Sequence, residues 1–134
     1  MTPDQLRRRL LAGDTVFGTL IVSPSPQWPG AVRECGLDFV FIDTEHIALH
    51  RVQLRWMRRT YAALGLPPLV RIPSPDPCAA GMVLDGGAAG AIPRRTTAGY
   101  HRLRVLPLKT GTFYFALTLS KRMLDNKTGK RYYR

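Results

Sequence analysis

Four polar residues in the first half of the chain have the types and spacing of a catalytic site. Asp43, Glu45 and His46 follow one apolar run, and Arg71 ends another. Asp43 and His46 are three residues apart, close enough for the carboxylate to accept a proton from the imidazole, fix its tautomer and raise its basicity. Arg71 could hold a carboxylate or a developing enolate through bidentate hydrogen bonds. This set predicts acid-base chemistry on a small anion.

Each of these residues also has a simpler interpretation. An Asp and a His after a strand can cap the next helix, and Arg71 can pair with a surface acid, the commoner fate of an arginine. His50 and His101 have no recognisable partner, and we expect both to be exposed to solvent. Cys35 and Cys78 are expected to be small core residues, because neither lies beside a candidate base.

The strands that would position the site alternate with helices. Apolar runs of strand length occupy Val16–Val22, Phe39–Ile42, Leu69–Ile72 and Ala89–Ile92. Such uninterrupted runs indicate parallel strands covered on both faces. The turn after the first run, Ser23-Pro-Ser-Pro-Gln27, lacks the G-x-G-x-x-G of a dinucleotide fold. The sequence therefore predicts an α/β fold, a partial (β/α)8 TIM barrel with about the first four β/α units, whose carboxyl strand ends meet at one rim.

Helix signals separate these strands. Thr2, Pro3 and Gln5 form a capping box with proline at the first helical position, and Gly13 can end that helix. A helical period begins at Arg51 and stops at Gly65. The apolar stripe of this helix is Leu54, Met57, Tyr61 and Leu64. The arginines expected to project away from that stripe are Arg51, Arg55, Arg58 and Arg59. Shorter helices are expected around residues 31–36 and 79–84.

Composition excludes several classes of protein. The chain has 134 residues, 45% of them hydrophobic and 22% charged, and no apolar run near the ~18 residues of a membrane span. A membrane span, a disordered chain and a coiled-coil rod are therefore not expected. The two cysteines form no C-x-x-C pair, which argues against a disulfide framework or a four-cysteine zinc site. The apolar stretch near the N-terminus is too short for a secretory signal, so a cytoplasmic location is expected.

Charge is distributed unevenly along the chain. The formal net charge is +11, but residues 1–92 carry only +1 and residues 93–134 carry +10. All four lysines lie after residue 92. This asymmetry predicts a globular part over 1–92 and a basic, atypical C-terminal tail over 93–134. A basic extension, a fusion or a change of reading frame could each produce it.

The tail contains a strand signal and a basic, aromatic end. Residues 113–119 could form a strand, and residues 125–129 resemble a turn. The last eight residues, Lys-Thr-Gly-Lys-Arg-Tyr-Tyr-Arg, mix cations with aromatic rings that can stack on single-stranded nucleic acid. No RNP or zinc-knuckle signature is present. We therefore expect nucleic acid to bind only nonspecifically and in a salt-sensitive way.

Three blocks of residues resemble a known family. Phe39-Val-Phe-Ile-Asp-Thr-Glu-His46, Pro67-Pro-Leu-Val-Arg-Ile-Pro73 and Leu84-Asp-Gly-Gly-Ala-Ala-Gly90 are similar, in order and spacing, to successive blocks of the HpcH/HpaI aldolases. These are metal-dependent class II pyruvate aldolases of the 4-hydroxy-2-oxoheptanedioate type. The resemblance covers roughly residues 5 to 92 and ends there, so it is more specific than a single motif.

The resemblance implies a fold, a reaction and roles for three residues. The family forms (β/α)8 barrels that assemble into homo-oligomers, and it cleaves a 4-hydroxy-2-oxo acid to pyruvate and an aldehyde. It implies that His46, oriented by Asp43, is the general base, and that Arg71 binds the substrate and stabilises the enolate oxygen. The implied partner is a small 2-oxo acid, with no membrane involved.

The resemblance also implies a divalent Mg²⁺, Mn²⁺ or Co²⁺ ion, whose ligands in the family are a Glu and an Asp on later strands. No residue here can be assigned that role, because the only acid after residue 92 is Asp125, in a basic turn. After Ile92 the family continues with a Pro-x-Val-Glu-Thr type segment, whereas this chain reads Pro93-Arg-Arg-Thr-Thr-Ala-Gly-Tyr100. This departure favours a frame change or a broken gene. The alternative function is an inactive aldolase fragment whose basic tail binds nucleic acid.

Overall fold

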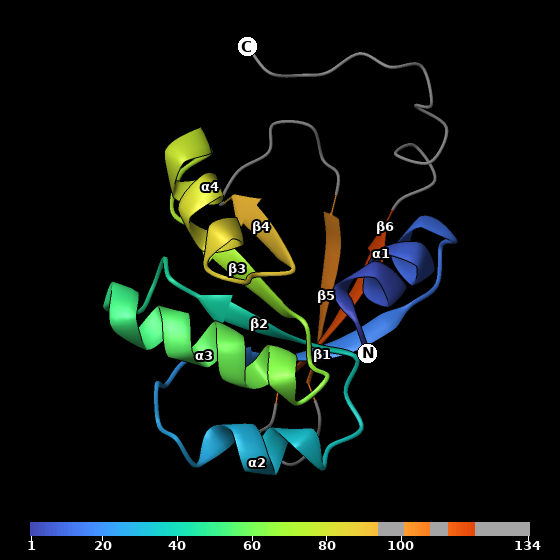
Figure 1. Ribbon diagram of the computed structural model, residues 1–134. Helices are drawn as coiled ribbons and strands as arrows, with labels where there is room; N and C mark the ends of the chain where they lie inside the picture. The colour runs from blue at the N-terminus through green and yellow to red at the C-terminus, as the bar shows by residue number, and fades with distance from the viewer. Residues whose placement is uncertain (94–100, 108–112, 120–134) are drawn as a thin grey trace.

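The computed structural model describes residues 1–93, 101–107 and 113–119 (Figure 1). In the last two ranges it describes the backbone. The helices are α1 (Pro3–Leu11), α2 (Trp28–Arg33), α3 (Arg51–Ala63) and α4 (Pro77–Asp85). The strands are β1 (Val16–Ile21), β2 (Phe39–Asp43), β3 (Pro68–Ile72), β4 (Gly90–Pro93), β5 (His101–Pro107) and β6 (Phe113–Leu119). The strands and helices expected within residues 1–93 are all present, with ends that differ by a few residues.

The strands form one sheet in the order β4-β3-β2-β1-β6-β5. β1 to β4 are parallel to their neighbours, and a helix lies between each successive pair in the chain. The predicted α/β fold with four parallel strands is therefore confirmed. β6 pairs antiparallel with β1, and β5 pairs antiparallel with β6. The strand expected at 113–119 is confirmed as β6, whereas β5 was not expected from the sequence, although Leu103 and Val105 alternate with arginines.

Two apolar clusters pack on opposite faces of the sheet. On β2, Val40 and Ile42 belong to the cluster that contains Met57 and Tyr61 of α3, whereas Phe39 and Phe41 belong to the cluster that contains Leu6 of α1. The alternation follows from the two-residue side-chain period of a strand. In Figure 1, α1 lies beside β1 and β6, apart from the other three helices. Apolar clusters thus lie on both faces of the sheet, with β2 fully buried and β4 half-buried.

Local capping explains where the helices begin. Thr2 and Gln5 form the expected capping box of α1. The Asp76 carboxylate accepts hydrogen bonds from the backbone N–H groups of Cys78 and Ala79, with Pro77 at the first helical position. α4 therefore begins two residues before the expected Ala79, because this acid satisfies N–H groups that would otherwise lack partners.

Two expectations about individual side chains are wrong. Cys35 and Cys78 are exposed rather than buried in the core. Arg58 is 4% exposed and does not project into solvent. Its Nε donates to the Leu54 carbonyl and its Nη1 to the Met82 and Val83 carbonyls, so the guanidinium binds the carboxyl end of α4. Positive charge is favourable there because the dipole of α4 is negative at that end.

Two glycines of the α4 segment should respond oppositely to alanine. A Cβ at Gly86 would overlap the Arg58 guanidinium, whereas a Cβ at Gly81 would meet no atom within 4 Å. Gly86→Ala should lower the free energy of unfolding by about 1–3 kcal/mol, as overpacking does. Gly81→Ala should raise it by roughly 0.5–1 kcal/mol, because alanine is the better helix former. Urea unfolding of both variants tests this, and changes of equal sign would contradict the packing of Arg58.

Within the described parts of the chain, none of the helices combines the length and apolarity needed to span a membrane.

Candidate active site

Strand register brings the two charged residues of the site together. Asp43, the last residue of β2, is the direct partner of Arg71 in β3. Asp43 lies on the same face of β2 as Phe39 and Phe41, since the three alternate along the strand. Both strands are parallel, so their carboxyl ends meet at one edge of the sheet. The structure therefore places Asp43 and Arg71 side by side, as the sequence predicts.

Asp43 is the centre of the hydrogen-bond network. Its side chain is 5% exposed. Its Oδ1 accepts hydrogen bonds from the backbone N–H groups of Glu45 (2.9 Å) and His46 (3.4 Å), and its Oδ2 lies 2.9 Å from His46 Nδ1 and 3.0 Å from Arg71 Nη1. Burial alone would raise the pKa of Asp43, but the hydrogen bonds and the Arg71 charge outweigh it and lower the pKa below its usual 3.8. Asp43 is therefore a carboxylate at neutral pH.

His46 is held at one nitrogen and open at the other. Its Nδ1 contacts Asp43 Oδ2, and its side chain is 65% exposed. An ionised Asp43 can only accept, so the neutral imidazole that satisfies this contact carries its proton on Nδ1. Nε2 then has a free lone pair, and it lies 3.9 Å from Glu45 Oε1. This arrangement suits a general base that takes a proton from a bound molecule.

Arg71 is fixed by two carboxylates and an aromatic ring. Its Nη1 pairs with Asp43 Oδ2 at 3.0 Å, and its Nε lies 3.1 Å from Glu45 Oε2. The guanidinium carbon lies 5.9 Å from the centre of the Phe41 ring, within cation–π range. Nη1 also lies 3.1 Å from His46 Nδ1. Nη2 forms no ion pair or hydrogen bond with residues 1–93, so this nitrogen can donate to an anionic ligand.

The pKa direction of Asp43 predicts how stability depends on pH. Because its pKa is lower in the folded protein than the usual 3.8, the unfolded chain binds the proton more tightly. The stabilisation is therefore present above pH 3.8 and is lost as the pH falls through the lower folded value. We expect the free energy of unfolding to fall more steeply with acidification below that pH in the wild type than in Asp43→Asn. Urea unfolding at a series of pH values measures both slopes, and equal slopes would contradict the prediction.

One group of possible metal donors is present among the described residues. Asp43, Glu45 and His46 offer ligand atoms within 4.8 Å of one another. Both carboxylates, however, already pair with Arg71, whose positive charge lies beside the same oxygens. A divalent cation would compete with this guanidinium for its ligands. The group as it stands therefore does not fit a metal ion, because Arg71 already pairs with both of its carboxylates.

Sequence reasoning missed the contributions of two neighbours. Glu45 was noted beside the site but given no role, whereas its carboxylate pairs with Arg71. The Thr44 hydroxyl donates to the Arg71 backbone carbonyl and so links the end of β2 to β3. The one feature of the sequence that could have indicated these contacts is the position of Thr44 and Glu45 between Asp43 and His46.

Other expectations are met in part or fall outside the described residues. His50 is exposed, as expected, and it precedes α3, where its backbone N–H donates to the Gln53 side chain. The side chain of His101, Asp125 and the basic aromatic end at 127–134 lie outside the described residues.

Solved structures similar to this chain include a citrate synthase and two proteins described as HpcH/HpaI aldolases. The crystal structure of the citrate synthase SbnG is 35% identical, with a TM-score of 0.62, over 68% of this chain and 37% of that one. An HpcH/HpaI aldolase from Desulfitobacterium hafniense DCB-2 is 32% identical, with a TM-score of 0.56, over 62% of this chain and 32% of that one. An HpcH/HpaI aldolase/citrate lyase family protein from Burkholderia cenocepacia J2315 is 32% identical, with a TM-score of 0.55, over 63% of this chain and 34% of that one.

These similarities confirm the resemblance to the HpcH/HpaI aldolase family and the expected partial-barrel fold. No protein-family model and no curated protein matches the chain. The chain spans 37% or less of the length of each of these solved structures. The similarity supports an enzyme of the general aldolase or lyase kind.

Proposed function

We propose that this chain carries part of a carbon-carbon lyase site, which cleaves a 4-hydroxy-2-oxo acid to pyruvate and an aldehyde. The part present supplies the general base and the anion-binding group. The observation that carries the proposal is the contact of Asp43, His46 and Arg71 at the carboxyl ends of β2 and β3, with distances of 2.9 to 3.1 Å. Structures similar to this chain include HpcH/HpaI aldolases, which supports the class of reaction. The proposed partner is a small 2-oxo acid.

His46 is the proposed base in this reaction. Its Nε2 accepts the proton of the substrate 4-hydroxyl, while Asp43 holds the imidazole through Nδ1 and stabilises the imidazolium that forms. The electrons of the former O–H bond become the aldehyde carbonyl as the C3–C4 bond breaks. The electron pair of the C3–C4 bond passes into the 2-oxo acid fragment, which becomes an enolate. Protonation of the enolate carbon then yields pyruvate.

Arg71 is the proposed anion-binding group. Negative charge develops on the 2-oxo oxygen as the enolate forms, and a donor aimed at that oxygen lowers the barrier. The two carboxylates hold the guanidinium through Nε and Nη1, which leaves Nη2 to donate to the substrate. Fixing the cation before the reaction avoids the cost of reorienting it during the bond cleavage.

A pyruvate-release assay on purified, size-checked protein tests the proposal. The substrate is 4-hydroxy-2-oxoheptanedioate, and each reaction is run with added Mg²⁺, Mn²⁺ or Co²⁺ and with a chelator, because the family resemblance implies a divalent ion. Pyruvate release above the rate of a His46→Asn sample supports the proposal. Release that is the same in both samples, under all metal conditions, would show that the Asp43–His46–Arg71 group does not perform this reaction.

A second candidate reaction is citrate formation, which the similarity to a citrate synthase favours. Both reactions pass through an enolate, that of the 2-oxo acid in the first and that of the acetyl donor in the second, so both need a base and an anion-binding cation such as His46 and Arg71. Citrate production from a 2-oxo dicarboxylic acid and an acetyl donor, measured on the same protein sample, distinguishes them. Citrate formation without pyruvate release would select this second reaction.

A further inference from the structure

A hollow on the outside of the helical layer lies away from the candidate active site. It has a volume of about 370 Å³, within the size range of sites for small ligands. Its lining residues are Arg55 and Arg59 of α3 and Asp85, Gly86 and Gly87 at the end of α4. The glycines precede β4 and so lie at the amino end of a parallel strand, whereas the candidate active site lies at the carboxyl ends.

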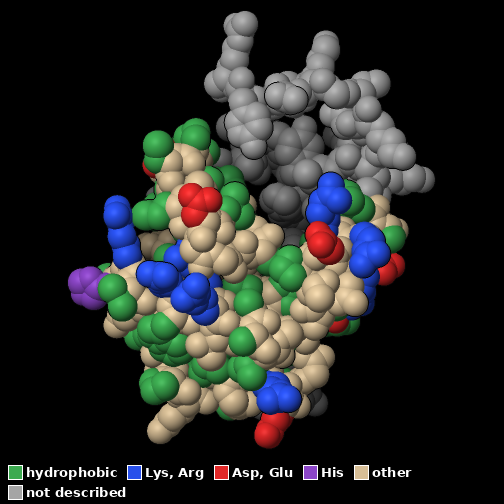
Figure 2. Space-filling view, viewed as in Figure 1, with side chains coloured by type: hydrophobic (Ala, Val, Ile, Leu, Met, Phe, Trp, Pro, Cys, Tyr) green, Lys and Arg blue, Asp and Glu red, His purple; other side chains and the backbone are tan. Residues whose placement is uncertain are grey.

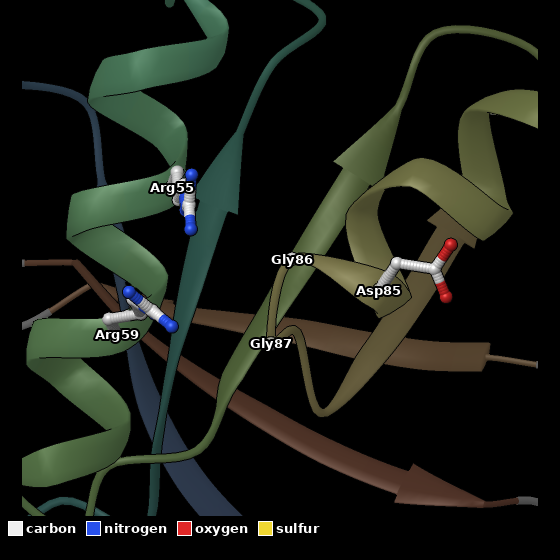
Figure 3. A pocket seen from close by; sticks show the side chains of 5 residues that line it. All are labelled: Arg55, Arg59, Asp85, Gly86 and Gly87. Atoms are coloured by element: carbon white, nitrogen blue, oxygen red, sulfur yellow. The ribbon is translucent and has the colours of Figure 1, made fainter.

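The charged residues that line this hollow are two arginines and one aspartate. Arg55 and Arg59 lie one helical turn apart on the same side of α3, and in Figure 3 both guanidinium groups point toward the gap between α3 and α4. The Asp85 carboxylate points away from them (Figure 3). In Figure 2, arginine side chains gather over α3 where it approaches α4. The charged lining of the hollow therefore has a net positive charge, with two guanidinium groups and one carboxylate.

No ion pair within residues 1–93 neutralises the two arginines of the hollow. The side chains of Arg55 and Arg59 form no ion pair or hydrogen bond with residues 1–93, and like charges at this spacing repel each other. A third guanidinium, of Arg58, is buried behind them and already offsets the negative end of α4. Burial, followed by the charge of Arg55, lowers the pKa of Arg58. A bound anion would relieve this repulsion.

The glycine turn leaves the space open. A Cβ at Gly86 would overlap Arg58, and Gly87 has a φ of 97°, a conformation that other residues rarely adopt. Both positions therefore lack a side chain that could fill the hollow. Their backbone N–H groups donate to Met82 and Leu84 carbonyls of α4, so recognition falls to the arginines.

We propose that this hollow binds a phosphate group, either as free phosphate or as a phosphate monoester. A phosphate carries close to two negative charges and presents three acceptor oxygens, so it can pair with both guanidinium groups at once. A single carboxylate has two oxygens and one charge, and it would leave one arginine unpaired. The site is separate from the candidate active site, so a ligand bound here is an effector or an anchor and not the substrate.

Isothermal titration calorimetry at constant ionic strength tests this proposal, with inorganic phosphate, glycerol 3-phosphate and succinate as probes. We expect saturable binding of phosphate to the wild type and at least about a tenfold weaker affinity for Arg55→Gln/Arg59→Gln, the loss typical of a charge-assisted pair. The matched control is Arg7→Gln/Arg8→Gln, which removes two exposed charges from α1 and should bind as the wild type does.

The outcomes separate the possible ligands. Tighter binding of glycerol 3-phosphate than of inorganic phosphate supports a monoester, and equal or weaker binding supports free phosphate. Succinate binding as tight as phosphate binding would overturn the choice of phosphate. An unchanged affinity in Arg55→Gln/Arg59→Gln, an equal loss in the α1 control, or no saturable binding would overturn the site itself. Both arginines are exposed, so the double variant should fold, and thermal unfolding confirms this.

Discussion

Replacing His46 with asparagine should lower pyruvate release by about 10²–10⁴-fold, the usual contribution of a positioned general base. Asparagine keeps a polar side chain of similar size but cannot take up the proton. The side chain is 65% exposed, so its removal should change the free energy of unfolding little. Measurement of kcat and KM should therefore show a loss in kcat with a small change in KM.

His50→Asn is the matched control for His46→Asn. His50 is exposed and precedes α3, and asparagine is a good residue at that N-cap position. The control should retain the wild-type rate. An equal loss of activity in both variants would mean that the change at His46 acts through the fold, and an unaltered rate in His46→Asn would exclude this residue as the base.

Replacing Arg71 with methionine should lower kcat/KM by about 10²–10³-fold, because the donor to the developing enolate oxygen is lost. The change also leaves the Asp43 and Glu45 carboxylates beside each other without the cation that pairs with both. The pKa of Asp43 should therefore rise, since the positive charge of Arg71 helps to lower it. A pH titration of the Asp43 carboxyl by NMR, alongside the kinetics, measures both effects.

Arg71→Lys distinguishes the geometry of the guanidinium from its charge. Lysine keeps the positive charge, but its single ammonium lacks the planar fork that reaches Asp43, Glu45 and a substrate together. It should restore the low pKa of Asp43 more fully than it restores kcat/KM. Arg33→Met, at an exposed position of α2, is the control for loss of one surface charge. Full activity in Arg71→Met would contradict the proposed role of Arg71 as the anion-binding group.

Within residues 1–93, the sequence alone was sufficient for the order of the elements and for Asp43, His46 and Arg71 as the candidate site. The apolar runs of β1 to β4 are continuous, and the glycines and prolines between them end each element, so alternation of strands and helices could be predicted without tertiary contacts. The block that contains Asp43 and His46, and the later block that contains Arg71, indicated the chemistry because each ends a buried strand. Parallel pairing then required both ends to lie at the same edge.

The partners of charged side chains could be known only from the tertiary structure. Glu45 pairs with Arg71, and Arg58 is buried between α3 and α4, yet neither contact follows from spacing along the chain. Arg58 lies four residues after Leu54 and so on the buried side of α3, unlike Arg55, but only the packing of α4 supplies the carbonyls that it binds. The pairing of β6 with β1 is equally a tertiary event.

The physical reason for this division is the range of the interactions. Periodicity, capping and turn chemistry act between residues a few positions apart, so a linear sequence displays them directly. Ion pairs and burial depend on which surfaces meet after the strands have taken their register, and a shift of one residue would turn Asp43 to the other face of its strand. The sequence thus determined which groups are available at the rim, and the packed sheet decided which of them contact one another.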